Sequence, residues 1–193
     1  MFSERIFSIG ISKFKLNGLD NETLCEQVRY FSTNPNNRNR IYGERDMGLN
    51  NPHLTELSKL ILKESQKITD SILANPNIDV TCFVKRIWGN HNLNGDICIP
   101  HVHRDSFLSA VYYPKASENS RLHFQSPFTD ALLAQIPISA SEKYDEFNSA
   151  YHQVHAETGM LVIFPANLLH FVPPTPGERY SIVYDIGVKH EHV

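Results

Sequence analysis

The sequence predicts an α+β fold in which two helices pack on a jelly roll made of two β-sheets. Two helical patterns fall within the first 76 of the 193 residues, and about eight short alternating segments follow them. Turn residues separate the later segments, as in 157–159 (Glu-Thr-Gly) and 173–177 (Pro-Pro-Thr-Pro-Gly). We expect a single domain over 1–193, with a mainly helical support at 1–76 and the jelly-roll core at 77–188.

The chain begins with a strand pattern that is followed by a short helix. Phe7, Ile9 and Ile11 alternate with polar or small residues, as in a half-buried strand. The turn dipeptide Asn17-Gly18 follows. Apolar residues at i, i+4 and i+7 then predict a helix over 21–31.

A second and longer helix is expected to begin at Asn51-Pro52 and to end at Asn75-Pro76. Asparagine is a good N-cap residue, and proline suits the first helical position. Its apolar face comprises Leu54, Leu57, Ile61, Ile68 and Ile72. The region 32–51 before it lacks periodicity and is expected to be a long loop.

Short strands account for the rest of the chain. The first covers the alternating segment 78–88, and the loop NHNLNGD follows it. Further strands are expected around His101 and over 122–125, 154–156, 160–164, 168–172 and 180–186. Segment 126–150 is weakly patterned, and together with loop 32–51 it is expected to shape the substrate site.

Potential metal ligands occupy alternate positions in the stretch 101–113, HVHRDSFLSAVYY. If this stretch is extended, His101, His103 and Asp105 point to the same side. Two histidines and one carboxylate on one face of a metal are typical of iron sites that activate O₂. His103, Asp105 and the distant His170 form such a set, whereas His101, His103 and His170 form an all-imidazole alternative. Both sets stay open at this point.

An arginine and a serine follow the distant histidine. Arg179 lies nine positions after His170, and Ser181 shares its strand face. A guanidinium binds a carboxylate with two parallel hydrogen bonds, and a hydroxyl can add a third. This pair can hold the far carboxylate of a dicarboxylic co-substrate whose keto-acid end chelates iron.

The combined motifs resemble those of the Fe(II)- and 2-oxoglutarate-dependent oxygenases. The sequence is most similar to a group from bacteria and phages with the pattern W-x-N, HxH, SGVYY, GxLVxFP, LxHxVxP and RxSI. The matching segments begin at Trp88, His101, Ser109 (SAVYY), Gly159 (GMLVIFP), Leu168 (LLHFVPP) and Arg179 (RYSIVYD). The resemblance covers nearly the whole chain.

This resemblance implies a cupin-like double-stranded β-helix with Fe(II) at its open mouth. Histidines and a carboxylate would bind the iron, and Arg179 with Ser181 would anchor the C5 carboxylate of 2-oxoglutarate. Tyr112 or Tyr113 would add a hydrogen bond, and only one of these neighbours can face the pocket. With O₂ as the second co-substrate, the implied reaction is hydroxylation with release of succinate and CO₂.

Two rival functions are weighed against this interpretation. A cupin-like three-histidine metalloenzyme would use His101, His103 and His170 without 2-oxoglutarate, and Arg179 and Ser181 would then have no role. A non-enzymatic β-sandwich protein would bind no metal at all.

The composition of the chain limits which binding partners and which cellular compartment we expect for it. The net charge is −3 without long runs of like charge, so we expect no binding to nucleic acid or to an anionic membrane. The first 16 residues match neither a signal peptide nor a membrane span. The three cysteines, Cys25, Cys82 and Cys98, form no CxxC motif, so we expect a cytoplasmic protein without disulfides.

Overall fold

The computed structural model describes residues 9–33, 45–73, 78–128, 149–174 and 176–192. Its elements in chain order are β1 (Ser12–Lys15), α1 (Asn21–Thr33), β2 (Arg45–Asp46), the 3₁₀ turn η2 (Pro52–Leu54), α2 (Thr55–Ile72), β3 (Ile78–Asn92), β4 (Cys98–His101), β5 (Leu108–Lys115), β6 (Arg121–Gln125), β7 (Tyr151–His155), β8 (Met160–Pro165), β9 (His170–Val172) and β10 (Arg179–His192).

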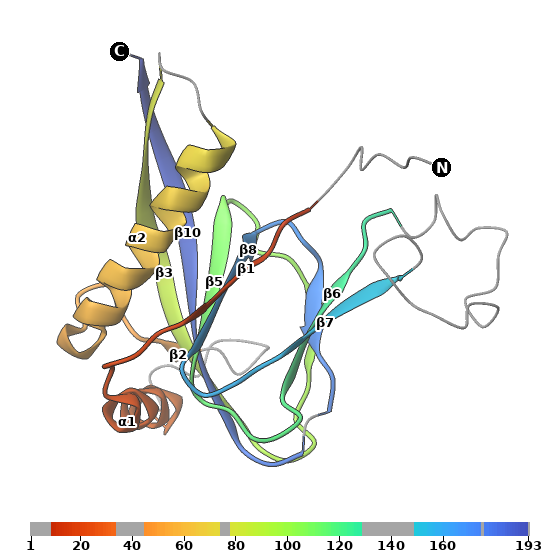
Figure 1. Ribbon diagram of the computed structural model, residues 1–193. Coiled ribbons are helices and arrows are strands. Elements are labelled where there is room, and N and C mark those ends of the chain that lie inside the picture. The colour runs from red at the N-terminus through yellow and green to blue at the C-terminus, as the bar shows by residue number, and fades with distance from the viewer. Residues whose placement is uncertain (1–8, 34–44, 74–77, 129–148, 175, 193) are drawn as a thin grey trace, which may run out of the picture.

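The strands form two antiparallel sheets that face each other, and both helices lie on the outer side of the larger one (Figure 1). The larger sheet has the order β1-β8-β5-β10-β3-β2, and the smaller sheet has the order β4-β9-β6-β7. The prediction of an α+β jelly roll with supporting helices is confirmed. The N-terminal support also contributes β1 and β2 to the larger sheet.

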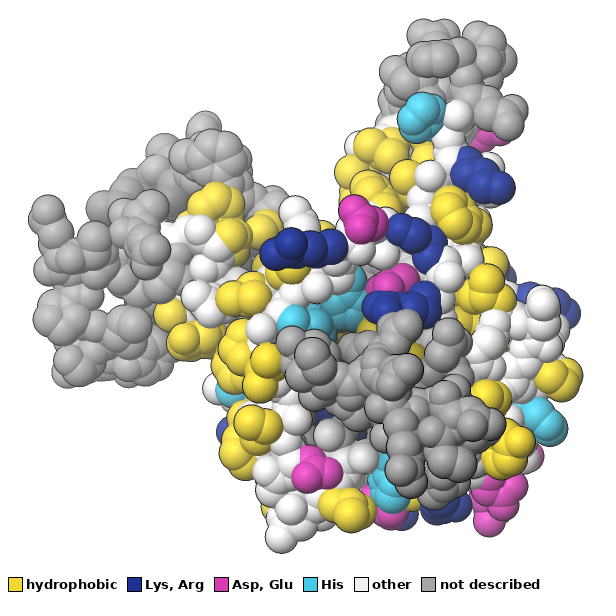
Figure 2. All heavy atoms as spheres, turned by 180° about the vertical axis from the view of Figure 1, so that it is seen from behind, with side chains coloured by type: hydrophobic (Ala, Val, Ile, Leu, Met, Phe, Trp, Pro, Cys, Tyr) yellow, Lys and Arg dark blue, Asp and Glu magenta, His cyan; other side chains and the backbone are white. Residues whose placement is uncertain are grey.

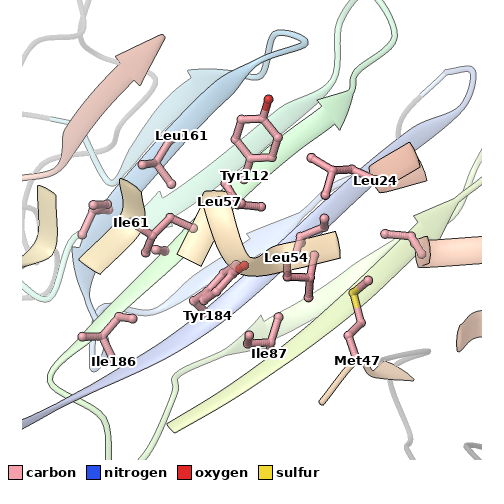
Figure 3. Close-up of a cluster of buried hydrophobic side chains, with 14 of the residues drawn as sticks. Leu24, Met47, Leu54, Leu57, Ile61, Ile87, Tyr112, Leu161, Tyr184 and Ile186 are labelled. Atoms are coloured by element: carbon pink, nitrogen blue, oxygen red, sulfur yellow. The ribbon is translucent and has the colours of Figure 1, made fainter. Parts of the chain in front are cut away.

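One hydrophobic core joins the helices to the larger sheet (Figure 3). Leu57 and Ile61 of α2 are buried there against Ile87 of β3 and Tyr184 of β10. Burying one such aliphatic side chain stabilises the fold by about 1.5–3 kcal/mol. A second core lies between the two sheets and includes Trp88, Phe124 and Phe164.

Both predicted helices are present. Asn51 caps the 3₁₀ turn that leads into the second helix, because its side chain accepts a hydrogen bond from the His53 amide and Pro52 opens that turn. The α-helix itself begins at Thr55, three residues after the predicted first helical position, Pro52. The predicted apolar face is wrong at Ile72, which is 60% exposed. The buried positions of α2 instead continue at four-residue spacing through Ser65 and Thr69.

Three strand predictions need correction. The first strand begins at Ser12, where it pairs with β8, and not within 7–11; Phe7 lies outside the described residues. β3 continues through Asn92, so the start of the predicted loop NHNLNGD is strand. The stretch 101–113 is not one strand, because β4 ends at His101 and β5 begins at Leu108. Most of the predicted loop and excursion, 34–44 and 129–148, lies outside the described residues.

Side-chain alternation along β10 separates the two cores. Tyr180, Ile182, Tyr184 and Ile186 belong to the core beneath the helices. The alternate residues therefore point toward the smaller sheet, and they are Arg179, Ser181, Val183 and Asp185. No helix in the described part of the chain is both long and apolar enough to cross a membrane.

Candidate metal centre and co-substrate pocket

Three histidines converge between the sheets. His101 ends β4 and pairs with His170, the first residue of β9, while His103 comes from the loop after β4. One ring nitrogen from each of the three lies within 4.8 Å of the others. His103 and His170 are buried and His101 is partly exposed. Figure 2 shows histidine side chains grouped in a hollow of the surface, bordered by Lys or Arg side chains.

The loop that carries His103 is held in place by the backbone and by aromatic rings. The His103 amide donates to the carbonyl of Ala166 over 2.8 Å. Its imidazole stacks on Trp88 at a centroid distance of 5.2 Å and meets Phe164 edge-on. The Arg86 guanidinium also contacts this stack, because it lies 4.3 Å from the Trp88 ring centroid. These contacts fix the ring without a strand.

Hydrogen bonds give all three imidazoles the same tautomer. Nδ1 of His103 donates to the Asp185 carboxylate over 2.6 Å, and Nδ1 of His101 and of His170 donate to the carbonyls of Ile99 and Leu168, each over 2.8 Å. Carboxylate and carbonyl oxygens only accept, so each Nδ1 carries a proton. In the neutral form of each ring the lone pair is therefore on Nε2.

This arrangement fits a bound cation. The Nε2 atoms of His103 and His170 are 3.1 Å apart, and when both rings are neutral both atoms carry lone pairs, so a positive ion between them removes their repulsion. Burial, with smaller contributions from His101 and His103, lowers the pKa of His170 to about 3 and keeps it neutral near pH 7. Imidazole donors suit iron as well as zinc, copper and nickel.

Asp105 lies apart from this group. It is exposed on a turn, has a φ of 63°, and its backbone carbonyl accepts a hydrogen bond from the Lys85 ammonium. The left-handed turn after His103 ends the alternation that the sequence pattern assumed. Of the two ligand sets left open, the structure brings together His101, His103 and His170 and does not bring Asp105 to them.

Arg179 lies in the pocket that the histidines line. It is 3% exposed, and one terminal nitrogen donates to the Asn92 side-chain carbonyl over 2.8 Å. Its Nε and its other terminal nitrogen are buried without a hydrogen-bond partner in the described structure. A buried cation with unpaired donors is costly unless an anion binds to it. The site can therefore accept a carboxylate.

The remaining predicted pocket residues divide between the two faces of the larger sheet. Ser181 and Tyr113 line the pocket, and the Tyr113 ring centroid is 6.0 Å from the Arg179 guanidinium carbon. Tyr112 points to the helices, where its hydroxyl donates to Asn21 over 2.6 Å (Figure 3). The structure thus places Tyr113, and not Tyr112, beside Arg179.

Sequence reasoning missed two polar residues of the site. Asn92, which orients Arg179, was expected in a loop. Asp185, which holds His103, was placed in the predicted strand 180–186 without a role in the site. The alternation of Arg179, Ser181, Val183 and Asp185 along one strand was the available signal that Asp185 faces the pocket side.

Comparison with protein families decides the identity. The model of a family described as "Putative 2OG-Fe(II) oxygenase" matches residues 86–185, slightly more than half of the chain. The chain belongs to this family. It is therefore an Fe(II)- and 2-oxoglutarate-dependent oxygenase. A search of curated protein sequences gives no significant match to it.

Solved structures share the fold of this oxygenase at low sequence identity. A prolyl-4-hydroxylase from Pseudomonas putida superposes with a TM-score of 0.55 at 15% identity, covering 92% of this chain and 87% of the other. HygX from Streptomyces hygroscopicus, with nickel, 2-oxoglutarate and hygromycin B bound, gives 0.59 at 11% identity, covering 93% and 83%. These likenesses confirm the double-stranded β-helix.

The oxygenase spans 60% of the length of another similar protein. This is a 2OG-Fe(II) oxygenase-family oxidoreductase from Burkholderia pseudomallei, which aligns over 72% of the present chain with a TM-score of 0.50 and 16% identity.

Proposed function

We propose that this oxygenase hydroxylates its substrate by using Fe(II) held by His101, His103 and His170. The observation that carries the proposal is the buried Arg179, which lines the same pocket as the three histidines and has two donors without a partner. A carboxylate at Arg179 satisfies the guanidinium and leaves the rest of a short dicarboxylate to extend toward the metal. 2-Oxoglutarate is a short dicarboxylate of this kind.

The three imidazoles would bind the iron through Nε2. Their tautomers are already set by acceptors at Nδ1, so no change of tautomer is needed when a metal binds. Such preorganisation by partners behind the ligands is a general feature of metal sites. Bound Fe(II), 2-oxoglutarate and O₂ together supply the oxidation of a substrate C–H bond to C–OH, with release of succinate and CO₂.

The pocket residues would hold the far end of 2-oxoglutarate. Arg179 would make two hydrogen bonds to the C5 carboxylate, with Asn92 fixing its plane. Burial raises the pKa of Tyr113 to about 12, so its phenol stays protonated and can donate. Ser181 lies in the same pocket and can add one more hydrogen bond.

A three-histidine metalloenzyme without 2-oxoglutarate is the second candidate, because the structure groups three histidines and no carboxylate as ligands among its described residues. Arg179 argues against it. Such an enzyme has no need for a buried guanidinium with unpaired donors in its pocket.

An anaerobic absorbance titration tests the proposal. Apo-protein receives Fe(II) and then 2-oxoglutarate, and a visible charge-transfer band is expected only when both are present. R179A should still bind Fe(II) but lose the band at wild-type concentrations of 2-oxoglutarate, while K189A, at an exposed strand position, should match the wild type.

Each of the other outcomes contradicts a different part of the proposed function. An unchanged band in R179A removes the co-substrate assignment. Iron binding without any band favours the three-histidine alternative, and no iron binding leaves a β-sandwich protein. We also propose the cytoplasm as its location, which the buried thiols of Cys25 and Cys82 support.

A further inference from the structure

Asp185 is a buried carboxylate directly behind one of the proposed metal ligands. It lies on β10 between Arg86 of β3 and Ser109 of β5, which pair with it in register. One carboxylate oxygen accepts from Nδ1 of His103 over 2.6 Å, and the other accepts from Arg86 over 3.0 Å. The residue is 5% exposed.

The three histidines differ in what holds their Nδ1 atoms. His101 and His170 donate to neutral backbone carbonyls, whereas His103 donates to a charged group. A carboxylate at this position makes the imidazole a stronger donor to a metal and fixes its orientation. His103 is therefore the ligand with the most anionic character.

We propose that Asp185 is a positioning residue that supplies, through His103, the negative charge that a metal-bound carboxylate provides in a site with two histidines and one carboxylate. The inference rests on the proposed ligand set of His101, His103 and His170. In this chain the position two residues after His101 is a histidine, His103, and not an aspartate or glutamate. The carboxylate of Asp185 would therefore act on the metal only through the imidazole of His103.

Arg86 sets how much of that charge reaches His103. Its side chain is 35% exposed and shares the Asp185 carboxylate with the imidazole. A purely structural role for the Arg86–Asp185 pair would be to join β3 to β10. The two roles predict opposite results when Arg86 is replaced by a neutral side chain, and this makes them separable.

The test measures Co(II) affinity by chelator competition, together with the visible absorption spectrum of the bound Co(II) and thermal unfolding of the metal-free protein. R86M should bind Co(II) at least as tightly as the wild type, because methionine can keep a contact with the Trp88 ring while Asp185 then serves His103 alone. R86M/D185N should bind about 10- to 100-fold more weakly than R86M and shift the Co(II) bands. The double variant is used because, in D185N alone, the new side-chain amide could meet the Arg86 guanidinium donor to donor.

The outcomes separate this inference from the function it builds on. Equal affinities and spectra for R86M and R86M/D185N, or weaker binding by R86M alone, contradict the role of Asp185. Absence of Co(II) binding to the wild type, or undiminished binding by H170A, contradicts the proposed ligand set itself. If R86M/D185N does not fold, the Co(II) affinities of R86M and the wild type still distinguish the positioning role of Asp185 from a purely structural one.

Discussion

Glu178 and Arg179 are consecutive residues whose side chains lie on opposite sides of the larger sheet. Glu178 accepts hydrogen bonds from Lys115 over 2.5 Å and from the Tyr180 hydroxyl over 2.7 Å, and it meets His91 at 2.9 Å. Arg179 points into the pocket. The nearest carboxylate in the sequence is therefore fully engaged elsewhere, and it leaves the guanidinium charge available to a ligand.

The Glu178 cluster makes stability depend on pH in the acid range. Hydrogen bonds from Lys115, Tyr180 and His91 lower the Glu178 pKa from 4.5 to about 2 in the folded protein. The contribution of Glu178 is therefore fully present above pH 4.5 and is lost as the pH falls toward 2. Denaturant unfolding should show a difference between wild type and E178Q that shrinks as the pH falls from about 6 to about 3. E157Q, at an exposed carboxylate 3.7 Å from Lys15, should show no such trend.

Asn92 should matter for 2-oxoglutarate binding through Arg179. N92A removes the acceptor that fixes the guanidinium plane, and we expect the dissociation constant of 2-oxoglutarate to rise about 5- to 10-fold, the worth of one hydrogen bond. N92D should weaken binding further, because its carboxylate competes with the ligand for the guanidinium. Anaerobic titration of the charge-transfer band measures both. Tighter binding by N92D would contradict the role given to Arg179.

Tyr112 and Tyr113 offer a matched pair of one-atom changes. Y113F should weaken 2-oxoglutarate binding and leave unfolding nearly unchanged. Y112F should lower the free energy of unfolding by about 1 kcal/mol, because it removes the hydrogen bond to Asn21 at the start of α1, and should spare the co-substrate. Urea unfolding and 2-oxoglutarate titration of both variants check this. If Y112F weakened 2-oxoglutarate binding and Y113F lowered the free energy of unfolding, the assignment of Tyr113 to the pocket would be contradicted.

The two possible ligand sets can be separated with two variants. D105N should keep wild-type Fe(II) affinity, and asparagine tolerates the left-handed backbone found there. H101A should lose Fe(II) affinity by at least about 10-fold, because it removes one of three imidazoles. Chelator competition under anaerobic conditions gives both constants. A large loss in D105N with little change in H101A would restore the carboxylate set.

Two isoleucines on α2 test the packing of the helices. I61A should cost about 2–5 kcal/mol, since Ile61 is fully buried against the larger sheet. I72A, at a position that is 60% exposed, should stay within about 0.5 kcal/mol of the wild type. Denaturant midpoints of the two variants would show the difference, and comparable losses would mean that the end of α2 is buried as the sequence pattern predicted.

Periodicity and local turn chemistry made much of the fold predictable. The i, i+4 pattern located α1, and Asn51-Pro52 located the 3₁₀ turn η2 that leads into α2, because both signals act over a few neighbouring residues. Asp105 was misplaced because a single left-handed turn breaks the alternation on which a strand prediction depends. Asn92 and Asp185 were missed because their roles come from pairing between β3 and β10, which the linear sequence does not display.

The alternation along β10 makes the strand intolerant of a shift in register. Removing one residue near its middle would turn every later side chain over. Tyr184 and Ile186 would then be presented to the site, and the Asp185 carboxylate would enter the hydrocarbon interior beneath α2. We therefore expect this strand of the oxygenase to tolerate substitutions but not insertions or deletions within it.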